Sequence, residues 1–280
     1  MRRKNWTFIL LAGIALAATL PPLYVFVNKA RPADHYSHIP LIPFVSLYLV
    51  LKHRKEMFSG GMVAHPVGIS LMIAGGGGLL AGWLAGITAI DRATIISLAG
   101  FSFLIGSYLV FYGSAGAKHR LFPLKFLIFA VPIPVPIIER IVSVLVAGSV
   151  FMTRLLFDAL SVPFVQEGAI FHLPGFSIEV AEECSSIRSS LALFITSVLA
   201  GHLFLKRFWT KVLLLSFVVP VAVFKNAVRI VTLTLLSGFI DMKIIRGGFL
   251  HKSGGFVFFG LGLCVMGVIL FIIRDMESRH

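Results

Sequence analysis

Long apolar runs separated by short basic clusters are the feature that most constrains this chain. Hydrophobic residues make up 58% of the sequence and charged residues 13%. Several runs reach the roughly 18 to 20 residues that a helix needs to cross a bilayer. A water-soluble domain of this length does not have such a composition. The sequence therefore predicts an all-α polytopic membrane protein.

We expect about eight transmembrane helices in one membrane domain covering residues 1–280. One of them, Ser37–Leu51, is at the short limit for crossing a bilayer. The first run is longer than the core of a typical signal peptide, and no convincing cleavage site follows it, so we expect an uncleaved signal anchor. The clearest runs, none with a central carboxylate, are Thr7–Val27, Pro66–Ile87, Thr94–Tyr112, Ile137–Leu160, Ser185–Leu205, Val212–Leu236 and Gly254–Ile273.

The basic residues predict the orientation of these helices. The formal net charge is +13, but Lys and Arg lie in short clusters between apolar runs, a pattern that reports membrane orientation and not nucleic-acid binding. We therefore expect no nucleic-acid partner, a multi-pass protein of the plasma membrane, and both termini in the cytoplasm. The clusters expected on the cytoplasmic side are residues 2–4, 52–55 and 118–120, Arg140, the group Lys206, Arg207 and Lys211, and Arg274.

Residues 122–136 (FPLKFLIFAVPIPVP) are apolar but lie between two basic clusters that we expect on the same side. Their prolines Pro132, Pro134 and Pro136 disfavour a straight helix. We interpret this stretch as a re-entrant or interfacial segment, which membranes tolerate where protein buries the freed backbone groups.

The sizeable extracytoplasmic loop covers residues 161–183. Within it, residues 176–180 alternate between apolar and polar side chains and follow the turn-forming pair Pro174 and Gly175. This pattern predicts two short strands folded back on each other. The loop is thus expected to form a small hairpin above the membrane and to lead the chain to Cys184.

Three reactive side chains from different helices are predicted near the outer membrane face. Cys184 lies at the N-terminal end of an expected helix, where backbone N–H groups and the helix dipole favour a thiolate. At about 1.5 Å per residue of helix, Arg229 lies about 27 Å from Lys211, in the outer part of the bilayer. An arginine at that depth is expected either to face a partner or a wet cavity, or to snorkel outward. His251 precedes the last span, and its imidazole can accept a proton and pass it on.

Three further residues are candidates for supporting or substrate-binding roles. Arg188, four residues after Cys184, either supports the thiolate or pairs with Glu183 or a lipid phosphate. Glu183, like Glu182, either positions substrate or is an ordinary partner of the helix dipole. Asn226 either forms a hydrogen bond within the site or merely joins neighbouring helices.

The remaining polar and small residues are given structural interpretations. Lys225 can snorkel away from Asn226. Cys264 lies inside an apolar run and is expected to be a small buried hydrophobe. The glycine run 75–78 lacks the Lys-Ser or Lys-Thr of a phosphate loop and indicates close helix packing. There is no HExxH motif and no other ligand pattern, so we expect no metal and no cofactor.

The order of three motifs resembles the exosortase and archaeosortase family of integral membrane transpeptidases. The motifs are CSSIR (184–188), NAVRI (226–230) and HKSGG (251–255), together with PIPVP and the LPGFSIEVAEEC approach to the cysteine. The resemblance implies that Cys184 is the nucleophile, that Arg229 stabilises the oxyanion or the thiolate, and that His251 acts as acid and base. Ser186 stands where the family is expected to prefer glycine, which leaves the subfamily open.

The reaction implied by this resemblance is that of a cysteine peptidase or transpeptidase in a bacterial inner membrane. Its partners would be membrane lipids and exported proteins anchored by a C-terminal sorting signal, made of a short motif, one transmembrane helix and a basic tail. Cleavage at the outer face would form a thioester on Cys184. The acceptor nucleophile, and the choice between hydrolysis and transpeptidation, stay open.

Two other classes of protein compete with this interpretation. In a transporter or channel, Arg229, Lys225 and His251 would line an anion path. Against it, the polar residues gather at one membrane face, and inverted repeats are not evident. A glutamate-dependent intramembrane protease would carry an EExxxR motif, but Arg188 falls one residue too late and Ile187 occupies the required position.

Overall fold

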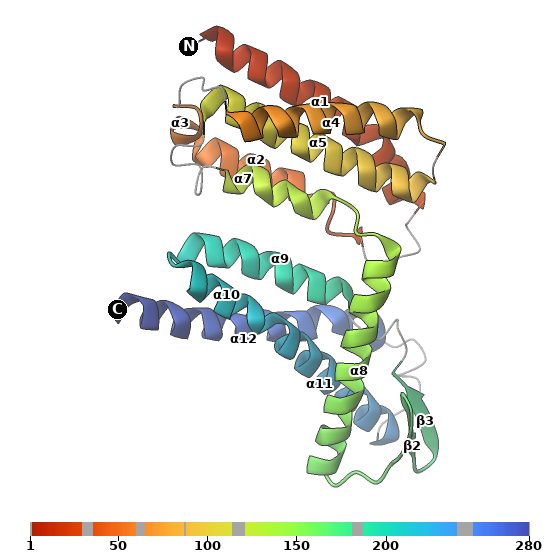
Figure 1. The fold of residues 1–280 in the computed structure, drawn as a ribbon. Coiled ribbons are helices and arrows are strands. Elements are labelled where there is room, and N and C mark those ends of the chain that lie inside the picture. The colour runs from red at the N-terminus through yellow and green to blue at the C-terminus, as the bar shows by residue number, and fades with distance from the viewer. Residues whose placement is uncertain are drawn as a thin grey trace. The chain divides into compact units, whose positions relative to one another are not determined.

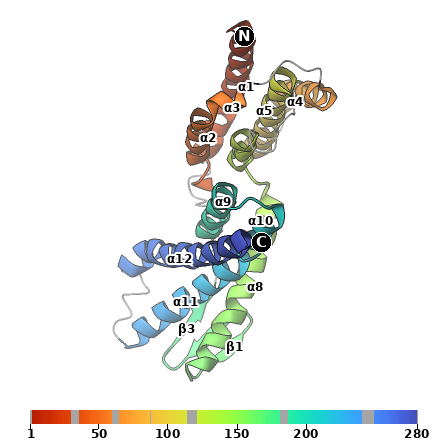
Figure 2. The same cartoon turned by 90° about the vertical axis from the view of Figure 1, so that its left-hand side faces the viewer.

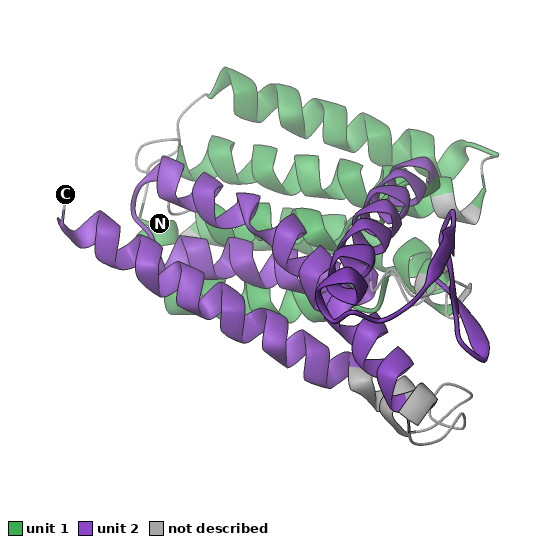
Figure 3. Cartoon of the chain, turned by 90° about the horizontal axis from the view of Figure 1, so that it is seen from below, with its two compact units in different colours: residues 1–135 green, residues 136–280 purple. Residues whose placement is uncertain are grey.

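The computed structural model describes residues 2–29, 36–59, 65–86, 88–113, 121–180, 187–239 and 249–279. The chain forms two compact units, Met1–Val135 and Pro136–His280, which Figure 3 shows in two colours. Apart from one small sheet in the second unit, the regular elements of the described part are helices (Figure 1). The all-α prediction is therefore confirmed, whereas the single membrane domain stays a prediction.

In unit 1, helix α5 packs against both α1 and α4 (Figures 1 and 2). The 3-10 helix η2 packs against α2 and α5. The elements of this unit are α1 (Arg2–Lys29), α2 (Leu41–Lys52), α3 (Arg54–Met57), α4 (Pro66–Leu84), α5 (Ala89–Tyr112), α7 (Phe122–Lys125) and η2 (Phe126–Ala130).

Glycines bring α4 and α5 into close contact. A Cβ atom added to Gly75 would lie 2.4 Å from the backbone nitrogen of Phe103, and one added to Gly106 would lie 2.5 Å from the backbone nitrogen of Met72. Helix backbones approach this closely in membranes where small residues line the interface. The interpretation of the glycine run as a packing surface is therefore confirmed.

Alanine substitutions within this run should separate packing from helix propensity. We expect Gly75→Ala to lower the free energy of unfolding by about 1 to 3 kcal/mol, because the new methyl group meets backbone and not a flexible side chain. Gly77 has no atom within 4 Å of an added Cβ, so Gly77→Ala should be neutral or up to about 1 kcal/mol stabilising. Unfolding of the two variants in the same detergent measures the difference, and equal effects would contradict the packing interpretation.

Two basic clusters in the described part of unit 1 lie at one end of its helices. The Lys4 ammonium lies 4.3 Å from the ring centroid of Tyr112, and the Tyr112 hydroxyl donates to Asn5 Oδ1 at 3.0 Å. At the same end, the Tyr108 hydroxyl donates to the carbonyl of Met57 at 2.8 Å. The clusters at residues 2–4 and 52–55 thus lie near the end of α5, as expected if they share one side of the membrane.

The proline-rich segment contains no long straight helix, as its prolines predict. After α7 and η2 the chain is irregular from 131 to 134. Side chains satisfy two carbonyls of this stretch: Thr94 Oγ1 donates to Pro132 at 3.3 Å and the Tyr36 hydroxyl donates to Ile133 at 3.0 Å. Protein groups therefore compensate the freed backbone, as the membrane environment requires.

The course of this segment differs from a re-entrant path, which was one of the two possibilities that we expected. Leu121 and Leu124 at its beginning share a core cluster with Tyr108, near the end of α5, whereas Pro132 contacts Thr94, near the beginning of α5. The segment thus runs along α5 without turning back. Each 3-10 residue advances the chain by about 2.0 Å, and each extended residue advances it by about 3.3 Å. A short stretch of such residues therefore covers a distance for which an α-helix would need more residues.

The described part of unit 2 contains four longer helices, one short helix and a three-stranded sheet. Helices α9, α11 and α12 pack against one another. In both views α8 runs across the axes of α9 and α12, not alongside them (Figures 1 and 2). The elements are α8 (Val135–Ala159), β1 (Val165–Glu167), β2 (Ile170–Leu173), β3 (Phe176–Glu179), α9 (Ile187–Phe204), α10 (Phe208–Ser216), α11 (Val218–Phe239) and α12 (Phe249–Arg279).

The expected span Val212–Leu236 is two helices, α10 and α11, separated at Phe217. Pro220 explains the break, because proline has no N–H to donate to the carbonyl of Ser216 and its ring clashes there. The pair still forms one candidate span, Phe208–Leu236, of 29 residues.

The sheet of the loop has three strands where the sequence predicted two. Strands β2 and β3 form the expected hairpin around Gly175, which has a φ of +94°. Strand β1 adds to the other edge of β2 through a turn at Gly168, with a φ of +60°. Phe171 in β2 is fully buried against Phe157 of α8. One face of the sheet is therefore fixed to the helices of unit 2.

Seven segments of the described part are long and apolar enough to cross a membrane. The expected span at 37–51 is not among them, because α2 has 12 residues and is about 18 Å long. A polytopic membrane protein is nevertheless confirmed. The seven segments are Arg3–Phe26, Pro66–Leu84, Asp91–Tyr112, Val135–Ala159, Ile187–Phe204, Phe208–Leu236 and Gly255–Arg279.

Candidate functional site

The beginnings of α9 and α12 point to the same end of unit 2. At the opposite end, a Glu277 carboxylate oxygen near the end of α12 accepts a hydrogen bond from the backbone N–H of Lys206 at 2.9 Å, and its second oxygen accepts one from Arg207 at 2.6 Å. These two residues directly follow α9. Helix α11, which packs against both α9 and α12, runs from that opposite end back toward their beginnings (Figure 1). The second half of α11 therefore shares the end of the unit where α9 and α12 begin.

Lys225 is buried in the contact between α9, α11 and α12. Its side chain is 3% exposed, and its ammonium donates a hydrogen bond to Ser189 Oγ of α9. A Cβ atom on Gly262 of α12 would lie 3.2 Å from Lys225 Cδ, so the glycine makes room for the lysine stem. The prediction that Lys225 snorkels away is wrong, because a hydroxyl inside the bundle gives the ammonium a partner.

Because of this contact, substitutions of Ser189 and of Lys225 should lower the free energy of unfolding by different amounts. Ser189→Ala leaves a buried ammonium without this acceptor and should lower the free energy of unfolding by about 3 kcal/mol. Lys225→Met keeps an unbranched chain of similar length and should cost less than about 1.5 kcal/mol. The double variant should unfold like Lys225→Met. Thermal unfolding in detergent tests this order, and a harmless Ser189→Ala would contradict it.

Asn226 joins α11 to α8. Its side chain is 2% exposed, and its Nδ2 donates to Ser149 Oγ at 2.9 Å. The two helices are close here, since a Cβ atom on Gly148 would lie 2.9 Å from Val223 Cγ2. Asn226 thus joins two helices, and the choice between a helix-joining role alone and a place in the active site stays a prediction.

The serines that bind Lys225 and Asn226, Ser189 and Ser149, were not predicted from the sequence. Ser149 and Ser189 each lie in an apolar helix and have no motif of their own. A weak signal was present, because Ser149 and Thr153 are four residues apart, on one face of α8. Both are buried, which marks that face as the one packed against protein.

The two candidate arginines lie toward the end of unit 2 where α9 begins. Arg229 follows Lys225 by one helical turn, about 6 Å along α11. It is half-buried, and its Nε atom has no exposed surface. Arg188 lies in the first turn of α9 and is exposed. Arg229 therefore has the more desolvated guanidinium of the two, which suits a role in charge stabilisation.

Three other predicted site residues lie wholly or partly outside the described residues. Cys184 and Glu183 lie outside the described residues, and so does the side chain of His251, although its backbone belongs to α12. The described residues nearest to Cys184 in sequence are Val180, which is buried against the helices, and Ile187 at the start of α9. The juxtaposition of Cys184, Arg229 and His251 therefore stays a prediction.

The second cysteine, Cys264, is a free thiol exposed on α12. The prediction that it is buried is wrong. An apolar side chain in a membrane helix gains little from burial, because lipid tails are as apolar as a protein core. Apolar sequence alone therefore does not distinguish a lipid-facing position from a buried one.

Within the described ranges, no group of three or more His, Cys, Asp or Glu residues is arranged to hold a metal ion. The loop histidine His172 instead bridges the sheet. Its Nδ1 lies 2.8 Å from Ser177 Oγ and its Nε2 lies 3.5 Å from Glu167 Oε2. All three residues lie on the face of the sheet opposite the buried Phe171.

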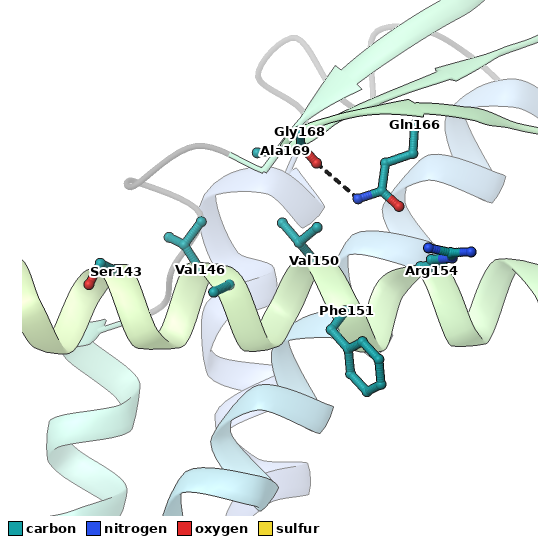
Figure 4. A pocket seen from close by; sticks show the side chains of 9 residues that line it. Ser143, Val146, Val150, Phe151, Arg154, Gln166, Gly168 and Ala169 are labelled. Atoms are coloured by element: carbon teal, nitrogen blue, oxygen red, sulfur yellow. Dashed lines mark hydrogen bonds between the residues drawn. The ribbon is translucent and has the colours of Figure 1, made fainter.

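A groove of about 490 Å³ lies between α8 and the turn that joins β1 to β2. Figure 4 shows the α8 residues below and Gln166, Gly168 and Ala169 above them. We call it the α8 groove. Its lining is mostly apolar, with polar groups from Ser143, Arg154 and Gln166. The groove was not predicted from the sequence, because it depends on the unexpected strand β1.

Comparisons with known proteins identify one family. A family model described as transmembrane exosortase matches residues 29–268. No curated protein and no solved structure matches the chain. The matched range covers most of the chain and includes the segments that contain Cys184, Arg229 and His251.

Proposed function

The chain belongs to the transmembrane exosortase family, and from this premise we propose that it is a cysteine transpeptidase that cleaves exported proteins at the outer face of the membrane. Family membership supports a membrane transpeptidase whose substrates are proteins with C-terminal signals. In the proposal, the signal consists of a short motif, one transmembrane helix and a basic tail, and the cut falls next to that helix.

The proposed reaction has two acyl-transfer steps. His251 accepts the proton of Cys184, whose sulfur attacks the scissile carbonyl carbon. The guanidinium of Arg229 stabilises the oxyanion of the tetrahedral intermediate. When the peptide C–N bond breaks, His251 returns the proton to the departing amine, and a thioester remains on Cys184. An acceptor nucleophile then loses its proton to His251 and displaces the sulfur, which releases the sorted protein.

The half-buried Arg229 is the observation that carries this proposal. It lies in the half of α11 that shares one end of unit 2 with the beginnings of α9 and α12. Cys184 precedes α9 by three residues, and His251 is in the first turn of α12. In a partly desolvated position the charge of a guanidinium is screened less than in water. Arg188, Glu183 and Asn226 keep supporting or substrate-binding roles in the proposal.

The proposed orientation places this end of unit 2 outside the cell. The opposite end carries Lys206 and Arg207, bound to Glu277, and basic clusters favour the cytoplasm. In unit 1 the two described basic clusters, at 2–4 and 52–55, likewise lie at one end. Each unit thus supports a multi-pass arrangement with both termini inside and the active site on the extracytoplasmic side.

An anion transporter is less consistent with the same contacts. Lys225, which would line the path, is buried and hydrogen-bonded to Ser189. The family match also favours an enzyme.

A processing assay tests the proposed function. An exported protein that ends in one apolar helix and a basic cluster is tagged at both ends and expressed with the enzyme. We expect the enzyme to remove the C-terminal tag and to leave the exported domain in one shorter form. An unchanged substrate beside an enzyme that is inserted in the membrane would contradict the proposal.

A further inference from the structure

Helix α8 has three distinct faces. One is buried against the neighbouring helices and carries Val142, Ser149 and Phe157. A second presents exposed apolar side chains at Ile137, Val144 and Leu155. The third lines the α8 groove with Ser143, Ala147, Val150 and Arg154.

The direction of α8 brings the groove to a membrane surface. Since α8 runs across α9 and α12 (Figures 1 and 2), it cannot cross a bilayer in the direction that these two helices take. Helices with one apolar face and one polar face lie in the interface between lipid and water. The exposed apolar face suits that boundary, and the loop that follows β3 leads to Cys184. The backbone N–H of Val180, four residues before Cys184, donates to the carbonyl of Ala169, which lines the groove.

The groove contains an acceptor without a donor. Gln166 Nε2 donates to the carbonyl of Gly168 at 2.9 Å (Figure 4). Gln166 Oε1 is buried and has no hydrogen-bond partner within the described residues. A buried acceptor of this kind is costly unless water or a ligand supplies an N–H or O–H group.

A cation lies at the same end of the groove. Arg154 is 62% exposed, and its Nε is 3.9 Å from Asp158 Oδ2. Because this contact is long and exposed, the other guanidinium N–H groups can bind a ligand oxygen. The groove therefore offers an apolar floor with one acceptor and one cationic donor beside each other (Figure 4).

From these features we infer that the α8 groove binds the extended segment of the anchored substrate that immediately precedes its transmembrane helix. A substrate backbone N–H donates to Gln166 Oε1, and a backbone or side-chain oxygen accepts from Arg154. Apolar substrate side chains lie over Ala147 and Val150. This inference rests on the proposed function, because it assigns the substrate site of that reaction.

A peptide fits the groove better than a lipid chain does. Hydrocarbon fills an apolar floor but leaves Gln166 Oε1 without a donor, whereas every non-proline residue of a peptide has one N–H and one carbonyl. A groove in the interface between lipid and water also suits a segment next to a transmembrane anchor, because such a segment lies at that boundary.

Two tryptophan substitutions on α8 test the groove. Ala147→Trp fills it, and we expect at least a tenfold slower cleavage of the tagged substrate. The matched control is Val144→Trp, one turn earlier at a position that is 55% exposed and does not line the groove; it should cleave at the wild-type rate. Both variants should keep the wild-type melting temperature and the wild-type rate of Cys184 alkylation. Equal cleavage rates for the two variants would overturn the inference.

Substitutions of the polar groups test how the substrate is held. Gln166→Leu and Arg154→Gln should each raise KM several-fold with little change in kcat, because both groups act in binding and not in the chemical step. Asp158→Asn removes the partner of Arg154 without removing the cation, so its KM should stay near that of the wild type. If Asp158→Asn raised KM as much as Arg154→Gln does, the ion pair and not the groove would explain the effect, which would contradict the inference.

Photocrosslinking identifies the occupant directly. A benzoylphenylalanine at position 147 of the Cys184→Ala protein should crosslink to the substrate segment next to the anchor, and one at position 144 should not. Crosslinks from position 147 to lipid alone would overturn the inference. If Cys184→Ala abolishes cleavage but the groove variants cleave normally, the substrate site is wrong and the function stands. Normal cleavage by Cys184→Ala would instead refute the function.

Discussion

Cys184→Ala is expected to abolish cleavage of the anchored substrate. Without the sulfur no thioester forms, and loss of a covalent nucleophile typically lowers the rate by about 10³-fold or more. The protein should still insert in the membrane and keep its melting temperature. Quantification of the shortened substrate on immunoblots of the same membranes measures the loss.

The second cysteine provides a matched control for this experiment. Cys264 is exposed on α12, and the proposed mechanism gives it no part in the reaction. Cys264→Ala should therefore cleave at the wild-type rate. It also leaves Cys184 as the single thiol of the chain. Loss of cleavage in Cys264→Ala, or its retention in Cys184→Ala, would each contradict the assignment of the nucleophile.

Arg229→Gln should lower the cleavage rate by about 10²- to 10³-fold, the typical effect of removing one donor to a developing oxyanion. Arg229→Lys should recover part of this loss, because it keeps the charge but not the planar array of N–H donors. Arg188→Gln is the control, since this exposed residue is assigned a supporting role and should have a smaller effect. Single-turnover cleavage in detergent measures all three rates.

The rate of Cys184 alkylation distinguishes the two roles that the family resemblance left open for Arg229. If the guanidinium stabilises the oxyanion, iodoacetamide should label Cys184 in Arg229→Gln as fast as in the wild type, both in the Cys264→Ala background. Slower labelling would assign Arg229 to the thiolate instead, because alkylation depends on the thiolate fraction. A wild-type cleavage rate in Arg229→Gln would exclude both roles.

The sequence predicted the helical membrane class well because the signal is simple. Apolar runs of bilayer length and basic clusters depend on composition alone, and the seven described candidate spans follow from them. The prolines in residues 131–136 likewise predicted that this segment forms no straight helix. The path of the segment along α5 was not predictable, because extended backbone covers the same distance with fewer residues.

Tertiary contacts decided the details that the sequence predicted incorrectly. Lys225 is buried because Ser189 and Gly262 from two other helices provide a partner and space, which no local pattern of α11 reveals. Strand β1 has three residues, too few for a recognisable alternation, and its pairing with β2 creates the α8 groove. The direction of α8 relative to α9 and α12 also escapes hydropathy, because α8 is long and apolar enough to be a candidate span like them.

A covalent adduct on Cys184 tests the central claim most directly. The Cys264→Ala protein is incubated with the tagged substrate, quenched with acid, digested and examined by mass spectrometry. We predict that the peptide containing Cys184 carries the N-terminal product of the substrate as a thioester, and that hydroxylamine releases it. An adduct on another residue, or complete cleavage with no adduct at any time before the product appears, would contradict the proposed function.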